Sequence, residues 1–356
     1  MSSKYRVLIF GASYGSLLAT KLALAGHDVK LVCLPEEADL INESGTLVRL
    51  PVRGHTTLVE IHSNGLPGTV SADVPTAVDP ADFDLVVLGM QEPQYRAPGV
   101  RDLLDKVATS RVPAMSIMNM PPLPYLERLP GVSAEGCRHC YTEPEVWDHF
   151  DSSLITLCSP DPQAFRPPEE GPNVLQVRLP TNFKSARFES EEQTAMLREL
   201  EAGIDAVRIQ IDGADSELPV KLRVHDSVMV PLAKWSMLLA GNYRCITPDG
   251  MRPIKEAVYG DIEAAQGIYE WVLDVCRSLG ASEEDLVPFS KYASAADGLE
   301  SPSSVARALF SGAQHIERVD CLVKTIAAQK GMRNDALDQI VALVDAKLEA
   351  NRAVPV

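Results

Sequence analysis

The stretch that most constrains the fold is IFGASYGSLLATKLALAGHDVKLV, which runs from Ile9 to Val32. An apolar run from Tyr5 to Phe10 predicts a buried strand, and the periodic segment after Gly15 predicts a helix. A second apolar run, Asp28 to Leu34, predicts another strand. A strand, a glycine-containing turn, a helix and a second strand are the opening of a βαβ unit that binds dinucleotides. We therefore expect a Rossmann-type parallel sheet in the N-terminal part of the chain.

The turn departs from the usual G-x-G-x-x-G pattern, because it reads Gly11-Ala12-Ser13-Tyr14-Gly15. Gly11 allows the tight bend, Gly15 lets the helix begin close to the strand, and Ser13 is small enough to lie beside a pyrophosphate. The N–H groups that open the helix would face the anion. An ordinary strand–turn–helix connection can also carry two glycines, but the βαβ context favours a nucleotide. We expect Gly11, Ser13, Tyr14 and Gly15 to contact it.

The residues at the end of the second expected strand bear on which dinucleotide binds. They read Cys33-Leu34-Pro35-Glu36-Glu37 and include no cation. The extra phosphate of NADP needs an arginine or lysine, whereas a carboxylate accepts hydrogen bonds from the ribose of NAD. We expect Glu36 or Glu37 to accept from the ribose, and NAD to be preferred over NADP; two solvated loop charges are the plain alternative. Three cations elsewhere would weaken the preference if the fold brought one in: Lys30, Arg49 and Arg53.

Strand and helix patterns alternate over residues 1–215 and predict an α/β, doubly wound dinucleotide-binding domain. A helix is expected from its cap Ser190, with Gln193 as the reciprocal capping partner, to Ala202, and it would end at Gly203. Residues 131–172, rich in Cys, His, Pro and acidic side chains, look like an insertion. Further strands are expected at 46–52, 56–61, 83–90, 112–120, 154–159, 174–179 and 207–211, and a helix at 100–109.

From about Leu222 onward the pattern is almost wholly helical. Residues 216–356 are therefore expected to form an all-helical C-terminal domain for substrate binding and dimerisation. With 356 residues, 46% of them apolar, the chain has ample length and apolar content for two folded domains.

Charge and composition exclude several kinds of partner. The formal net charge of −16 argues against a nucleic acid, which needs a basic surface. No apolar run approaches the roughly 20 residues of a membrane helix, and a strand from residue 5 leaves no room for a signal peptide. Seven scattered cysteines suit reduced thiols. We expect a cytoplasmic homodimer that acts on a small molecule.

The segment PLAKWSMLLAGNYRCIT, from Pro231 to Thr247, places a lysine on an otherwise apolar helix. Lys234, Leu238 and Asn242 are spaced i, i+4, i+8 and so are expected on one face. A buried lysine is costly unless it has a role or partner, and with Asn242 it could hold a carbonyl oxygen. The alternative is a lysine at a helix start with its head in water.

The segment SPSSVARALFSGAQHIERVDCLV, residues 301–323, predicts a helix capped by Ser303 or Ser304. Glu317 and Asp320 are expected on the following helix. By itself the pattern indicates a capped helix with a solvated acidic face.

Cys137-Arg138-His139-Cys140 has the spacing of half a zinc site, with Glu143 and His149 nearby. No second CxxC is present, and a structural zinc takes four ligands. We therefore expect two ordinary loop thiols and no metal.

In this order, the segments resemble the ketopantoate reductase family over nearly the whole chain. GASYGSLLATKLALAGHDVKLV is similar to the family's opening, and DLVVLGMQEPQ, with Met90 and Gln91 as cofactor contacts, to its fourth-strand segment. SIMNMPPLPYLERL resembles the stretch with an active-site asparagine, here Asn119. KWSMLLAGN resembles the catalytic-lysine helix, which gives Lys234 and Asn242, and SSVARALFSGAQHIE gives a substrate-binding Ser304 and an active-site Glu317.

The resemblance implies an NAD(P)-dependent oxidoreductase that transfers a hydride between nicotinamide and a keto or hydroxy compound. Lys234 would polarise the carbonyl and supply the proton, and Asn119 and Asn242 would fix the substrate and the nicotinamide amide. Glu317 would orient the substrate or tune Lys234. The nicotinamide would lie near Met90 and Asn119, with the substrate between the domains.

Departures from the family pattern point away from ketopantoate. The turn is one residue short, Gln91 stands where a lysine is common, and Ser304 and Glu317 are one residue further apart. Leu238 replaces a second asparagine that binds the substrate's polar end, which would leave a polar group unpaired at a cost of roughly 1–3 kcal/mol. We expect a larger or less polar substrate. An opine- or imine-type dehydrogenase and a non-catalytic nucleotide sensor remain alternatives.

Overall fold

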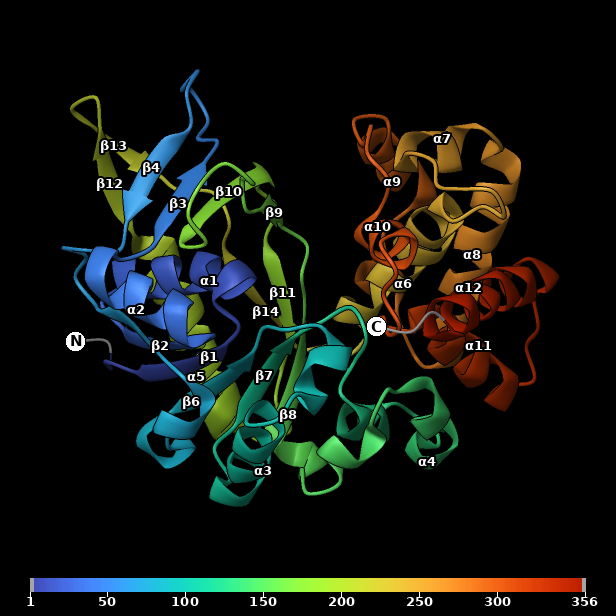
Figure 1. The fold of residues 1–356 in the computed structure, drawn as a ribbon, viewed down its shortest axis with the longest axis horizontal. Helices are drawn as coiled ribbons and strands as arrows, with labels where there is room; N and C mark the ends of the chain where they lie inside the picture. The colour runs from blue at the N-terminus through green and yellow to red at the C-terminus, as the bar shows by residue number, and fades with distance from the viewer. Residues whose placement is uncertain (1–2, 354–356) are drawn as a thin grey trace. The chain divides into compact units, whose positions relative to one another are not determined.

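The computed structural model describes residues 3–353, and contacts divide them into two compact units (Figure 1). The first unit holds the residues up to Met90, Gln94–Met118 and Val146–Asp226. The second holds Gln91–Pro93, Asn119–Glu145 and the chain from Ser227 onward. The segment expected as an insertion is thus divided between the two units.

The first unit is built on an eight-stranded sheet in the order β14-β11-β8-β7-β6-β1-β2-β5. Every pairing is parallel except β8 with β11. All four apolar residues Val7 to Phe10 of β1 are fully buried, as expected for a central parallel strand. The predicted doubly wound sheet is confirmed. Its strands are β1 (Arg6–Phe10), β2 (Asp28–Val32), β5 (Val70–Asp73), β6 (Leu85–Leu88), β7 (Ala114–Ile117), β8 (Ile155–Ser159), β11 (Phe183–Ala186) and β14 (Leu222–His225).

A second sheet of four strands, in the order β4-β3-β10-β9, belongs to the same unit. It holds the strands expected near residues 46–61, and β3 pairs in parallel with β10 rather than joining the large sheet. A separate hairpin contains β12 and β13. These strands are β3 (Leu47–Leu50), β4 (Val59–His62), β9 (Gln163–Phe165), β10 (Val174–Leu179), β12 (Arg208–Ile211) and β13 (Ala214–Glu217).

The helices of the first unit are α1 (Ala12–Leu24), α2 (Pro35–Ser44), α3 (Val100–Ser110) and α5 (Glu191–Ala206). Ser190 caps α5 as predicted and accepts from the Gln193 N–H at 3.5 Å. The buried Gln193 Oε1 has no partner among the described residues, so the reciprocal capping bond is not made. The predicted end at Gly203 is wrong: Gly203 is not among the glycines of positive φ, so it does not take the left-handed conformation that ends helices, and α5 continues to Ala206.

The second unit is helical, which confirms the predicted C-terminal part. Helix does not begin at Leu222, however, because β14 pairs in parallel with β11 and completes the large sheet. The expected boundary between residues 215 and 216 falls within β13, whereas the units part at Asp226. No described helix is long and apolar enough to cross a membrane. The helices are α4 (Ala134–Cys137), α6 (Lys234–Met237), α7 (Ile254–Tyr259), α8 (Ile262–Ser278), α9 (Phe289–Ala296), α10 (Ser304–Phe310), α11 (Val319–Gln329) and α12 (Asp335–Ala353).

Candidate functional site

The turn from β1 into α1 needs glycine at both ends. Gly11 has a φ of 89°, and a Cβ on it would lie 2.8 Å from Met90 Cγ and 3.3 Å from the Gly89 carbonyl oxygen. A Cβ on Gly15 would lie 2.8 Å from Ile9 Cγ2. The close approach of helix and strand that the sequence predicts is therefore present.

This turn presents backbone N–H groups. Gly11 is the N-cap of α1, and within residues 3–353 no side chain caps that helix. Ser13, in its first turn, is exposed. The turn also lies where β1 has β2 on one side and β6 on the other, the switch point at which such sheets bind ligands. An uncapped 13-residue helix at this place fits the pyrophosphate of a dinucleotide.

Tyr14 serves packing through its side chain. Its hydroxyl donates to the Pro162 carbonyl at 2.7 Å, and its ring meets Phe183 edge-on. Burial raises the pKa of the Tyr14 hydroxyl well above its usual value. What Tyr14 offers an anion at the turn is its backbone N–H.

The residues after β2 open a helix rather than a loop. Pro35 is the first residue of α2, and Glu36 and Glu37 lie in its first turn. Glu36 is exposed, whereas the half-buried Glu37 carboxylate forms an ion pair with Arg166.

Arg166 was missed by sequence reasoning, because it lies 129 residues from Glu37, just past β9. Its buried Nε has no partner among the described residues. The cations that the sequence suggested are placed otherwise: Lys30 pairs with Asp73, Arg49 pairs with Glu60 and Glu170, and Arg53 is exposed.

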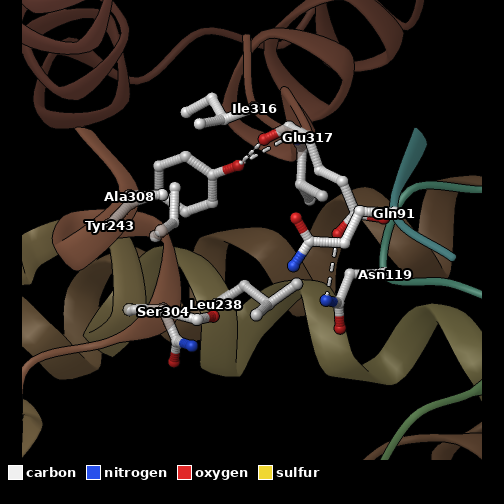
Figure 2. A pocket seen from close by; sticks show the side chains of 11 residues that line it. Gln91, Asn119, Leu238, Tyr243, Ser304, Ala308, Ile316 and Glu317 are labelled. Atoms are coloured by element: carbon white, nitrogen blue, oxygen red, sulfur yellow. Dashed lines mark hydrogen bonds between the residues drawn. The ribbon is translucent and has the colours of Figure 1, made fainter. Parts of the chain in front are cut away.

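A pocket in the second unit brings together six residues that the sequence selected (Figure 2). Its empty volume, with the solvent at its mouth, is about 430 Å³. Apolar side chains of Val305, Ala308, Ile316 and Val319 form much of the remaining wall. The six residues are Gln91, Asn119, Leu238, Asn242, Ser304 and Glu317.

Glu317 is the best-held side chain of this pocket. Its Oε2 accepts from Asn119 Nδ2 at 3.1 Å and its Oε1 from the Glu92 N–H at 3.4 Å. The Tyr243 hydroxyl donates to its backbone carbonyl (Figure 2). Burial raises the pKa of the Glu317 carboxyl, opposed by the hydrogen bonds from Asn119 and the Glu92 N–H and by the positive charge of Lys234.

The predicted acidic face is wrong. Glu317 precedes α11 instead of lying on a helix, and it is only 9% exposed. Asp320 is on α11 but fully buried, where Arg318 donates two hydrogen bonds of 3.0 Å to its carboxylate. Both acids are held inside the unit because partners compensate their burial.

Asn119 offers an unused acceptor. Its Nδ2 is engaged by Glu317, and its backbone carbonyl accepts from Trp235 Nε1 at 3.3 Å. Its buried Oδ1 has no partner in the part of the chain that the structure describes. A buried amide oxygen with no partner is costly, so a donor on a ligand would stabilise it.

The lysine helix is not a straight α-helix. After α6 the backbone makes a π-helical turn over Leu238–Asn242, a distortion common at functional sites. Leu238 and Asn242 both line the pocket, but Lys234 is not among its lining residues. Lys234 is half-buried and near enough to lower the pKa of Glu317.

Ser303, not Ser304, caps α10, because its hydroxyl accepts from the Ala306 N–H at 3.3 Å. The same hydroxyl donates to the Asn242 carbonyl at 2.6 Å. Ser304 is left exposed on the pocket wall.

Two further residues were missed. Glu92 is 2% exposed, and its carboxylate accepts from the Thr142 N–H at 3.0 Å and hydroxyl at 2.8 Å. Tyr243 links the lysine segment to the backbone of Glu317 and Val319. The only signal for Glu92 was a charged residue four positions after the last residue of an apolar strand, β6.

No family model matches the chain, and no curated protein matches its sequence. Solved structures do match. A 2-dehydropantoate 2-reductase from Methylococcus capsulatus aligns with a TM-score of 0.65 at 13% identity, over 99% of this chain and 98% of that one. The chain has the fold of the ketopantoate reductases.

Two other structures share this fold. D-mandelate dehydrogenase, solved with NADH and anilino(oxo)acetate, aligns with a TM-score of 0.65 at 14% identity, over 98% of this chain and 100% of that one. A dimeric ketopantoate reductase from Staphylococcus aureus aligns with a TM-score of 0.56 at 12% identity, over 97% and 99% of the two chains.

Proposed function

We propose that this protein is an NAD(P)-dependent oxidoreductase that interconverts a keto and a hydroxy compound. The observation that carries the proposal is the pocket where Asn119, Leu238, Asn242, Ser304 and Glu317 meet, with an unpartnered amide oxygen buried among them. These residues come from distant segments that resemble the active-site segments of one family. The uncapped glycine turn of the first unit supports dinucleotide binding.

Each residue has a role that its surroundings support. A bound nicotinamide would supply or accept the hydride. Lys234 would polarise the substrate carbonyl and donate the proton during reduction, or take it during oxidation. Asn119 Oδ1 would accept from a donor on the substrate or on the nicotinamide amide, and the bond to Glu317 orients it. Asn242 and Ser304 would contact the substrate.

The pocket wall favours a substrate with an apolar group. Leu238 lines the pocket together with Val305, Ala308 and Ile316, so a hydroxyl placed against these apolar side chains would lose its hydrogen bonds. We expect ketopantoate, which carries such a hydroxyl, to be a poor substrate compared with a 2-keto acid whose side chain is apolar. The likeness to an enzyme solved with anilino(oxo)acetate agrees with this class.

NAD is proposed as the preferred cofactor. Arg166 brings a positive charge to α2, but Glu37 neutralises it. A 2′-phosphate would have to displace this carboxylate and would meet the exposed Glu36 beside it, whereas a ribose diol can donate to Glu36. The cofactor contacts proposed are the turn residues Gly11, Ser13, Tyr14 and Gly15, together with Glu36, Met90 and Gln91.

We further propose a cytoplasmic homodimer, as the fold is that of a protein described as dimeric. Light scattering after gel filtration measures this directly, and a monomer at micromolar concentration would contradict it.

A substrate screen that follows the absorbance of the reduced nicotinamide tests the function. The full chain is incubated with NADH or NADPH and a panel of 2-keto acids, including ketopantoate, with and without an amine. Turnover of an apolar keto acid with NADH is the expected result. Turnover only with an amine would indicate an opine- or imine-type dehydrogenase. Cofactor binding without any turnover would indicate a nucleotide sensor.

A further inference from the structure

Four donor atoms from two segments of the second unit converge at one point. Cys140 Sγ lies 3.2 Å from Cys321 Sγ, 3.6 Å from His139 Nε2 and 3.4 Å from Thr325 Oγ1. His139 Nε2 lies 3.3 Å from Thr325 Oγ1. The two sulfurs and the imidazole nitrogen all lie within 4.8 Å of one another. Cys140 is buried, Cys321 is half-buried and His139 is exposed, so the cluster opens to solvent on one side.

These separations are close to the edges of a tetrahedral zinc site. With Zn–S of about 2.3 Å and Zn–N of about 2.0 Å, ligand atoms at tetrahedral angles lie about 3.8 Å apart for two sulfurs and about 3.5 Å for sulfur and nitrogen. The distance from Cys140 Sγ to His139 Nε2, 3.6 Å, is close to the second value. The sulfurs need to part by roughly 0.6 Å, a small side-chain rotation. The Thr325 hydroxyl oxygen lies beside two of these three ligand atoms, Cys140 Sγ and His139 Nε2.

We propose that His139, Cys140 and Cys321 bind a zinc ion, with the oxygen of Thr325, or of a water in its place, as the fourth ligand. Two thiolates and one imidazole form a donor set that binds zinc in preference to magnesium or calcium. The CxxC of the sequence is divided: Cys137 lies outside the cluster and takes a hydrogen bond from Gln329. Cys321 and Thr325, one turn apart on α11, supply the further ligands that no second CxxC provides.

The zinc ion would hold in place the segment directly after Cys140, which lies behind the pocket. Directly after Cys140, the Tyr141 hydroxyl donates to the Pro121 carbonyl at 2.7 Å, and Thr142 holds the buried carboxylate of Glu92. The Glu92 N–H in turn donates to Glu317. The role is therefore structural: zinc joins this segment to α11 beside the residues that place Glu317. The inference concerns binding of the metal and does not depend on the proposed reaction.

Metal analysis of the full chain tests the proposal. The protein is purified without a polyhistidine tag or chelator, reconstituted with zinc chloride under reducing conditions and dialysed. We expect about one zinc per chain, and nearly none in His139→Ala and Cys321→Ser. Cys276→Ser, which changes a buried cysteine on α8 outside the cluster, should keep the metal. Cobalt in place of zinc should give a thiolate-to-metal charge-transfer band that both ligand variants lose.

Folding of the variants is controlled by their melting temperatures. His139 is exposed, so His139→Ala should melt as the wild type does in the presence of a chelator, and zinc should raise only the wild-type value. Less than about a tenth of an equivalent of zinc in the reconstituted wild type would overturn the proposal. Retention of zinc by Cys321→Ser would do the same. A Cys140–Cys321 disulfide in protein kept under reducing conditions would also overturn the proposal. Mass spectrometry would detect it as a mass lower by two hydrogens.

Discussion

The glycine turn of the first unit and the pocket of the second are built from different materials. The turn between β1 and α1 offers backbone N–H groups, and its two glycines serve to keep side chains away. The pocket is lined by side chains: Asn119 donates to the Glu317 carboxylate, and the Tyr243 hydroxyl donates to the Glu317 backbone carbonyl (Figure 2). A backbone site depends on conformation, so it is local in the sequence. A side-chain site depends on partners that the fold must bring together.

Lys234→Ala should give the largest effect and shows whether the second unit carries chemistry. The variant should fold and lose kcat by roughly 10²–10⁴, because a general acid contributes that much. Single-turnover and steady-state rates measure it, with Lys255→Ala, a solvent-exposed lysine paired with Asp297, as the control. Activity close to the wild type would remove Lys234 from the mechanism.

The same contrast explains how much the sequence could predict. Gly11 and Gly15 lie four residues apart, and the strand and helix around them have clear periods, so the α/β fold and its turn were predictable. Five strands of the large sheet, β1, β2, β6, β7 and β8, were expected within a few residues of their bounds, whereas β5, β11 and β14 were not expected. The helical second unit was predicted too, although periodicity did not reveal that β14 pairs with β11.

The pocket was predicted only through family resemblance. Spacing placed Lys234, Leu238 and Asn242 on one α-helical face, but a π-helical turn follows α6. Glu317 was expected in solvent, because nothing local shows that Asn119, 198 residues away, donates to it. Arg166 was missed for the same reason. Contacts between distant segments are set by packing, which a single sequence does not display.

Gly11→Ala tests whether the turn is a backbone site. The left-handed φ of 89° and the 2.8 Å contact with Met90 Cγ strain any Cβ, at a cost of order 1–3 kcal/mol. We expect a Kd for NADH about five- to hundredfold weaker, measured by nicotinamide fluorescence. Gly26→Ala is the matched control: its φ is 94° at the other end of α1 with no neighbour within 4 Å, so it should lower stability but not affinity. Equal affinity losses in both variants would point to general destabilisation.

Glu37→Ala tests the ion pair of Glu37 with Arg166, a feature of the first unit that depends on side chains. Removing the carboxylate leaves the Arg166 guanidinium free to bind a 2′-phosphate. The ratio of the NADPH and NADH dissociation constants should shift toward NADPH by about tenfold or more, as a charge-assisted hydrogen bond is worth roughly 1.5–3 kcal/mol. The wild type should bind NADH more tightly.

The double variant Glu37→Ala/Arg166→Gln should return the ratio of the two dissociation constants toward the wild-type value. Glu36→Ala should weaken the binding of NADH alone. Tighter binding of NADPH than NADH by the wild-type apo-protein would refute the proposed preference. An unchanged ratio in Glu37→Ala would show that Arg166 does not reach the adenosine ribose.

Of the predicted substitutions, Glu317→Gln should have the smallest effect. It tests the burial of the Glu317 carboxyl, which distinguishes the pocket from the turn. Burial raises the pKa of Glu317 in the folded chain, so the protonated form is favoured there. Its contribution to stability is then complete below the unfolded carboxyl pKa of about 4.3 and is lost as pH rises through the raised folded value. Gln cannot ionise and keeps an oxygen to accept from Asn119. The melting temperature of Glu317→Gln minus that of the wild type should therefore rise with pH from about pH 4 and level off once Glu317 has ionised.

Glu349→Gln, which removes an exposed carboxylate on α12 of the same unit, controls for the loss of a negative charge. A difference that stays flat or falls with pH would mean that Glu317 is ionised in the fold as readily as in water, and that the pocket is open at this residue.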